Sequence, residues 1–120
     1  AISARSHQNA HHSDGDQGPK GTVTSCHYDP KHNLLCQVVG AKRIRLYHPQ
    51  YSDRLYPVEG KLYNNSQVDV ERPDLERFPL AANLPYWECT LQRGEMLYIP
   101  PRFWHHVRSL SVSFSVSFWW

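Results

Sequence analysis

The last twelve residues alternate regularly between small polar and apolar side chains. Serine occupies every odd position from Ser109 to Ser117, and Leu, Val or Phe occupies every even position from Leu110 to Phe118. A period of two predicts a β-strand with two different faces. An ordinary exposed face would more often carry Lys, Glu or Arg, so the serine row favours an interior face that leaves room for a ligand. A serine row that simply faces solvent is the alternative.

Shorter runs of the same kind predict a β-rich domain. Residues 49–79 are rich in Pro, Asn, Asp and Tyr, so they predict a loop with one helical turn at 73–78. The runs at 33–40 and 42–49 are expected to form a hairpin through Gly40 and Ala41. No helical periodicity exceeds a turn or two, and the fold class is therefore all-β, most simply a small barrel. Strands are expected at 21–27, 33–40, 42–49, 86–92, 96–101, 104–110 and 109–120.

Residues 1–17 form a polar, histidine-rich segment with almost no large apolar side chains. Such a segment cannot bury enough apolar surface to offset the cost of ordering the chain, so we expect it to be disordered. The spacing of His7, His11 and His12 would suit a metal on a helix, but helix support is poor and exposed histidines are the preferred interpretation. The ordered domain is expected at residues 18–120.

Composition narrows the class of protein. The 120 residues suffice for one modest domain, and a formal net charge of +2 lacks the dense basic surface of a nucleic-acid binder. No run approaches the roughly 18 apolar residues of a membrane span, so neither nucleic acid nor membrane is an expected partner. Three cysteines without a C-x-x-C spacing fit a reducing compartment better than a disulfide framework.

Two sequence frames carry candidate chemistry. His27 and Asp29 are two positions apart, and residues i and i+2 of a strand point to the same side. Their frame, G-x5-H-x-D-x3-N-x6-G, begins at Gly21 and ends at Gly40. A second frame runs from Gly94 to a histidine in "GEMLYIPPRFWH". The two frames, in this order, resemble the two signatures of the cupin superfamily.

The candidate metal ligands are His27, Asp29 and His105. Two histidines and one carboxylate form the facial triad of non-haem Fe(II) oxygenases, which leaves positions open for a co-substrate and O2. His106 competes with His105 for the third place, and the cupin spacing selects His105. The alternative is that His27 is a buried, hydrogen-bonded histidine and Asp29 a turn residue.

Four further residues are candidates for binding a co-substrate. Lys42 opens the strand after Gly40, where its ammonium group would fix the distal carboxylate of a dicarboxylic acid. Taken alone, a lysine in the run "KRIR" favours a solvated surface position, and the cupin frames reverse that preference. Thr24 and Asn33 flank the H-x-D pair, and each can hydrogen-bond a carboxylate. Trp119 shares the parity of the serine row, so it would form an inner wall that excludes water.

Longer stretches resemble the C-terminal part of a jumonji-C (JmjC) domain, of the type found in lysine demethylases and arginyl hydroxylases. They include "GTVTSCHYDPKHNLLCQVVGAKRIRLYHPQ", "GEMLYIPPRFWHHVRSL" and "SVSFSVSFWW". The resemblance implies a double-stranded β-helix (the jelly-roll or cupin barrel), Fe(II) held by His27, Asp29 and His105, 2-oxoglutarate and O2. Thr24, Asn33, Lys42 and Trp119 would contact 2-oxoglutarate.

The activity that the resemblance implies is hydroxylation of arginine or demethylation of methyl-lysine in a protein or peptide. Histones and ribosomal or chromatin-associated proteins are the candidate substrates, in the nucleus or the cytoplasm. An acidic loop could receive a basic peptide, although a solvated insert is the preferred interpretation. Its acidic residues are Glu59, Asp69, Glu71, Asp74 and Glu76.

The chain departs from JmjC domains near its start. Residues 13–17 read "SDGDQ" where the family carries an apolar, aromatic-containing strand, so we expect a barrel that is incomplete on its N-terminal side. The even-numbered row from Leu110 to Phe118 would then lack packing partners and favour self-association. A truncated, catalytically silent cupin-like barrel is the alternative function. A different cupin enzyme is disfavoured by Asp29 and Lys42.

Overall fold

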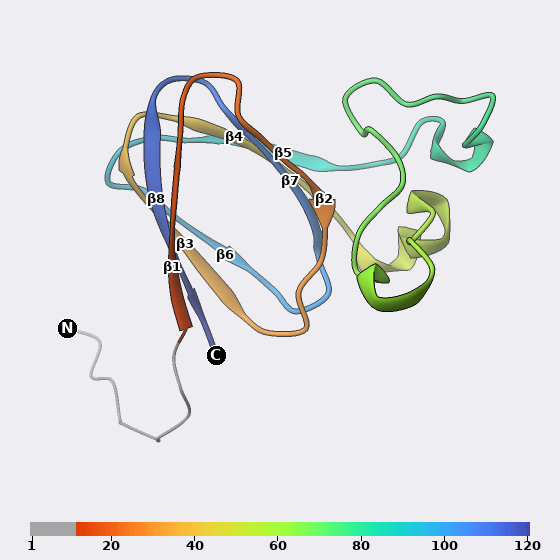
Figure 1. The fold of residues 1–120 in the computed structure, drawn as a ribbon, viewed down its shortest axis with the longest axis horizontal. Helices are drawn as coiled ribbons and strands as arrows, with labels where there is room; N and C mark the ends of the chain where they lie inside the picture. The colour runs from red at the N-terminus through yellow and green to blue at the C-terminus, as the bar shows by residue number, and fades with distance from the viewer. Residues whose placement is uncertain (1–11) are drawn as a thin grey trace.

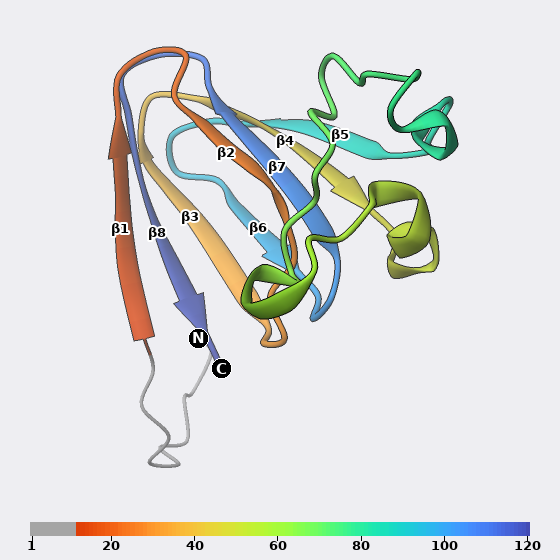
Figure 2. The ribbon, with the colours of Figure 1, turned by 45° about the vertical axis from the view of Figure 1, so that its right-hand side comes forward.

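The protein folds into two antiparallel β-sheets that face one another. The structure, a computed structural model, describes residues 12–120, and Figure 1 and Figure 2 show the two sheets as the walls of an open barrel. The strand orders are β1-β8-β3-β6 and β2-β7-β4-β5. This confirms an all-β jelly-roll fold of the cupin type. The strands are β1 (His12–Gly18), β2 (Val23–His27), β3 (Asn33–Val39), β4 (Lys42–Tyr47), β5 (Trp87–Leu91), β6 (Met96–Ile99), β7 (Trp104–Ser109) and β8 (Ser113–Trp119).

The hairpin expected between residues 33–40 and 42–49 is wrong. β3 pairs with β8 and β6, whereas β4 pairs with β7 and β5, so the chain crosses from one sheet to the other at Gly40. Gly40 has a φ of 70°, and the N–H of Ala41 donates to Oγ of Ser111 over 3.1 Å. The short connection therefore turns a corner of the barrel and packs against the corner between β7 and β8.

The disorder expected for residues 12–17 is also wrong. His12–Gly18 forms strand β1, which pairs with β8 from His12 opposite Trp119 to Gly18 opposite Ser113. Main-chain hydrogen bonding to a neighbouring strand does not depend on apolar side chains, so a polar segment can extend a sheet at its edge. His7 and His11 lie outside the described residues.

The interior and the outer face of the second sheet hold separate apolar clusters. Between the sheets lie Leu35, Ile44, Leu91 and Val107. Residues 48–86 cover the other face of β4 and β7, where Trp104 and Tyr47 are buried beneath them. This insert contains 3-10 helices at Pro49–Leu55, Gly60–Leu62 and Pro79–Ala81. It also contains the expected turn, in which the N–H of Phe78 donates to the carbonyl of Asp74 over 2.7 Å.

The serine row of β8 faces the interior, as its pattern favours. Ser113 and Ser115 are fully buried, and Ser117 lines an internal cavity. The apolar row takes the outer face, where Phe118 is 41% exposed and Phe114 and Val116 are partly buried. Among the described residues, no helix has both the length and the apolar character needed to cross a membrane.

Candidate metal centre

His27 is the last residue of β2 and lies directly opposite His105 of β7. The pairing of β2 with β7 shifts register between Thr24 and His27, which marks a β-bulge. A bulge adds a residue to one strand and re-aims the side chains beyond it. Thr24 and His27, three positions apart, therefore line the same cavity, whereas a regular strand would direct them to opposite faces.

Asp29 lies in the loop after β2, and its carboxylate returns toward both histidines. Its Oδ2 lies 3.7 Å from Nε2 of His27 and 3.6 Å from Nε2 of His105. The main-chain N–H of Arg102 donates to the carbonyl of Asp29 over 2.8 Å, which ties this loop to the turn before β7. His27 and Asp29 thus converge as their spacing predicts, although Asp29 lies beyond the end of the strand.

Main-chain carbonyl groups orient both histidine rings. Nδ1 of His27 lies 2.8 Å from the carbonyl oxygen of Ser25, and Nδ1 of His105 lies 3.0 Å from that of Phe103. A carbonyl oxygen only accepts, so Nδ1 of each ring carries a proton, and in the neutral ring Nε2 presents the lone pair. Burial, reinforced by the neighbouring His27, lowers the pKa of His105 to about 4. The ring is therefore neutral at pH 7, the form that binds a metal ion.

The three side chains fit one divalent transition-metal ion. Each offers one ligand atom, and these atoms all lie within 4.8 Å of one another. Two imidazoles and one carboxylate suit Fe(II), and three protein ligands leave the remaining coordination positions open. The donor set contains no thiolate, so it does not form the closed sulfur-rich cage of a structural zinc site.

A cavity of about 160 Å³ opens beside the three ligands. Leu35, Ile99 and Val107 form its apolar wall. All seven residues singled out by the sequence line this cavity, although they come from five strands and a loop. They are Thr24, His27, Asp29, Asn33, Lys42, His105 and Trp119.

Asn33 gives the cavity an unsatisfied polar group. The residue is 4% exposed, and Oδ1 has no hydrogen-bond partner among the described residues. Buried amide groups are rarely left unpaired, and a side-chain amide can turn to present either its oxygen or its NH2 group. A ligand in the cavity would therefore find a hydrogen-bonding partner at Asn33.

One charged residue of the cavity escaped the sequence reasoning. Asp16 of β1 lines the cavity, and its Oδ2 lies 2.8 Å from Nζ of the buried Lys42. Oγ of Ser115 also accepts from Lys42, over 2.7 Å. The sequence offers no local signal for Asp16, because its position depends on the pairing of β1 with β8, a strand about 100 residues away along the chain.

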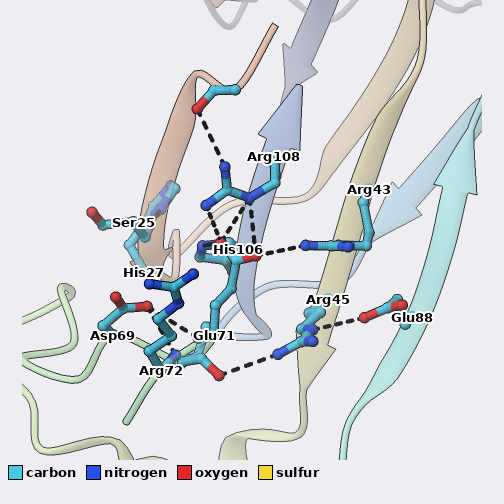
Figure 3. Close-up of polar contacts among 12 residues, drawn as sticks. Ser25, His27, Arg43, Arg45, Asp69, Glu71, Arg72, Glu88, His106 and Arg108 are labelled. Atoms are coloured by element: carbon cyan, nitrogen blue, oxygen red, sulfur yellow. Dashed lines mark hydrogen bonds and ion pairs between the residues drawn. The ribbon is translucent and has the colours of Figure 1, made fainter. Parts of the chain in front are cut away.

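His106 lies on the opposite face of β7, as the alternation predicts, and belongs to a separate ion-pair cluster (Figure 3). Its Nε2 lies 3.3 Å from Oε1 of Glu71 in the insert. Glu71 also accepts from Arg43 over 2.6 Å and from Nη2 of Arg108 over 2.7 Å. Glu71 therefore fastens the insert to the sheet, so the acidic loop is neither a fully solvated insert nor wholly available to a basic peptide.

Comparison with known proteins places these features in a family. The family model described as a cupin-like domain matches residues 9–120. Lysine-specific demethylase JMJ30 of Arabidopsis thaliana is 58% identical over 104 residues, which are 86% of this chain and 24% of that protein.

Two further relatives match a similar share. JmjC domain-containing protein D of Dictyostelium discoideum is 59% identical over 101 residues, 82% of this chain and 22% of that protein. Lysine-specific demethylase 8 of Danio rerio is 55% identical over 104 residues, 86% of this chain and 26% of that protein. The chain thus spans about a quarter of the length of these relatives. With its cupin-type barrel and these matches, the chain belongs to the cupin-like domain family and resembles the JmjC proteins within it.

Proposed function

We propose that this chain holds the metal and co-substrate site of an Fe(II)- and 2-oxoglutarate-dependent oxygenase that acts on protein side chains. The observation that carries the proposal is the convergence of His27, Asp29 and His105 at a cavity that also contains a buried lysine. Fe(II), with 2-oxoglutarate and O2, would supply the oxidising power needed to hydroxylate a C–H bond.

The residues of the cavity would divide the work. Nε2 of each histidine and the carboxylate of Asp29 would hold the ion, while the Ser25 and Phe103 carbonyls keep the rings aligned. Thr24 and Asn33 would hydrogen-bond the co-substrate, whose distal carboxylate would lie against Lys42. Trp119 and the apolar wall would exclude water.

The substrate is a protein or peptide in this proposal. Two of the three relatives described above are named lysine-specific demethylases, which supports oxidation at an N-methyl carbon of lysine. Hydroxylation at that carbon leads to loss of the methyl group, whereas hydroxylation at an arginine carbon leaves the hydroxyl in place. We propose the nucleus or the cytoplasm as the location, since histones and ribosomal or chromatin-associated proteins are the candidate substrates.

Mass spectrometry of peptides incubated with the chain, Fe(II), 2-oxoglutarate and O2 tests the proposal. A gain of one oxygen indicates hydroxylation, and loss of a methyl group indicates demethylation. His27→Ala is expected to abolish both turnover and metal binding, since it removes one of three ligands. His48→Ala is the matched control, because His48 does not line the cavity: it caps a 3-10 helix of the insert and its ring packs against that of Phe103. Unchanged turnover in His27→Ala would refute the site.

A catalytically silent barrel is the second candidate, and one observation favours it. Lys42, proposed for the co-substrate, already contacts the carboxylate of Asp16. Succinate formation, measured with and without peptide, separates the candidates, because a silent barrel would bind metal without producing succinate.

A further inference from the structure

Asp16 places a carboxylate of the chain itself on the lysine of the cavity. Its Oδ2 lies 2.8 Å from Nζ of Lys42, and its main-chain carbonyl oxygen lies 3.5 Å from the same nitrogen. Oγ of Ser115 accepts from Nζ over 2.7 Å. An ammonium group has three N–H donors, so these three oxygens occupy its hydrogen-bonding capacity.

The side chains of Lys42 and Asp16 differ greatly in their exposure to solvent. The side chain of Lys42 is 1% exposed, whereas that of Asp16 is 52% exposed. Asp16 therefore contacts the buried ammonium group of Lys42 from a partly exposed position. A second carboxylate that is to take the same hydrogen bond from Lys42 must displace that of Asp16.

Strand pairing fixes Asp16 in this place. β1 runs beside β8 (Figure 2). In the register of this pair, Asp16 lies directly opposite Ser115. Both residues contact Lys42, which comes from β4 in the facing sheet. The contact between Asp16 and Lys42 therefore bridges the two sheets, and the pairing of β1 with β8 positions it.

We infer that Asp16 is a specificity-determining residue. Its carboxylate occupies the position on Lys42 that the distal carboxylate of a dicarboxylate ligand would otherwise take. This inference rests on the proposed function. The carboxylate of Asp16 neutralises Lys42 and repels a second carboxylate brought to the same spot, so the cavity binds 2-oxoglutarate weakly. A 2-oxo acid without the distal carboxylate needs no contact with Lys42, so Asp16 does not weaken its binding.

Calorimetric titration of 2-oxo acids into the 120-residue chain loaded with Mn(II) tests this inference without turnover. The probes are 2-oxoglutarate and pyruvate, which share the 2-oxo acid group and differ in the distal carboxylate. Asp16→Asn keeps an oxygen that can accept from Lys42 and removes the charge. It is expected to tighten 2-oxoglutarate binding by about tenfold or more and to leave pyruvate binding unchanged.

Three further variants complete the design. Asp16→Ser removes the charge with a smaller side chain and is expected to give the same gain, which guards against a folding defect in one variant. Lys42→Met, combined with Asp16→Asn, is expected to abolish the gain. Asp53→Asn is the control, because it removes one charge from an exposed position of the 3-10 helix Pro49–Leu55, away from the cavity.

The outcomes separate this inference from the proposed function. If pyruvate binds and the Asp16 variants bind 2-oxoglutarate no more tightly than the unchanged chain, the inference is wrong and the oxygenase proposal stands. If metal binds but no variant binds either 2-oxo acid, both are wrong. Equal gains for 2-oxoglutarate and pyruvate would also overturn the inference, since the effect would not involve the distal carboxylate.

Discussion

Glu71 joins the insert to the sheet through ion pairs, and its charge makes this contact sensitive to acid. It contacts Arg43, His106 and Arg108, which come from β4 and β7 (Figure 3). Hydrogen bonds from Arg108 lower the pKa of Glu71 from about 4.5 to about 2. Burial lowers the pKa of His106, so this neighbour is neutral at pH 7.

Glu71→Gln is expected to reduce the free energy of unfolding near pH 6 by about 1 to 2 kcal/mol, a figure that allows for solvent screening of the partly exposed arginines. Because the folded state lowers the pKa of Glu71, its contribution is complete above pH 4.5 and is lost as the pH falls toward 2. The difference in free energy of unfolding between Glu71→Gln and the unchanged chain should therefore vanish near pH 2. Urea denaturation between pH 2 and 6 measures it.

Glu76→Gln is the control for this experiment, since Glu76 is exposed in the same insert. Its stability should follow that of the unchanged chain within about 0.5 kcal/mol at every pH. A difference between Glu71→Gln and the unchanged chain that stays constant from pH 6 to pH 2 would show that packing, and not the charge, holds the insert.

The corner between β3 and β4 is the element whose geometry tolerates least change. Gly40 has a φ of 70°, and a Cβ at this position would collide with the main-chain oxygen of Val112 and lie 2.5 Å from Oγ of Ser111. Gly21, between β1 and β2, has a φ of 87° but no atom within 4 Å of the corresponding position. A substitution at either glycine would therefore strain the backbone, because both have a positive φ. Only at Gly40 would the added Cβ also collide with other atoms.

Gly40→Ala is expected to lower the free energy of unfolding by about 2 to 4 kcal/mol, from backbone strain and displacement of the facing corner. Gly21→Ala should cost about 1 kcal/mol, from strain alone. Thermal or urea denaturation of both variants measures the two costs. If both substitutions lower the free energy of unfolding equally, the facing corner moves without a loss of stability, and Gly40 is needed only for its positive φ.

Strand positions and faces were predictable because they depend on local patterns. The expected strands at 21–27 and 42–49 correspond to β2 and β4, and the parity of Ser115 and Ser117 gave the inner face of β8. Which strands pair was not predictable from the same patterns, since a short connection at Gly40 looks alike in a hairpin and in a sheet-to-sheet corner. β1 was missed because its partner, β8, is distant in the sequence.

The residues of the candidate site were largely predictable, whereas the strand contacts that position them were not. Two spaced frames and one parity rule identified seven residues that line a single cavity, and their roles stay predictions until they are tested. The β-bulge that turns Thr24 inward left no sequence signal, because a period of two assigns it to the other face. Asp16 was missed for the same reason as β1, since its contact with Lys42 forms only when distant strands come together.

At the scale of the whole molecule, the two sheets differ in what covers them. The insert packs over the β2-β7-β4-β5 sheet, and no described segment lies over the outer face of the β1-β8-β3-β6 sheet (Figure 1). Cross-strand rows of apolar side chains occupy that outer face. One row contains Leu34, Tyr98 and Phe118, and the next contains Cys36, Met96 and Val116. Contiguous apolar surface of this kind favours association.

The isolated chain is therefore expected to self-associate through this outer face, with an apparent mass that rises with protein concentration. Light scattering over a series of concentrations measures it. Met96, 65% exposed, begins the edge strand β6 and lies beside Cys36 on this face, so Met96→Lys should shift the chain toward monomer by bringing a charge into the contact. Leu62→Lys changes a residue of similar exposure, 62%, in the insert, and should leave the association unchanged. A clean monomer at every concentration would refute the expectation, and equal effects of the two substitutions would assign the association to general hydrophobicity instead of to this sheet.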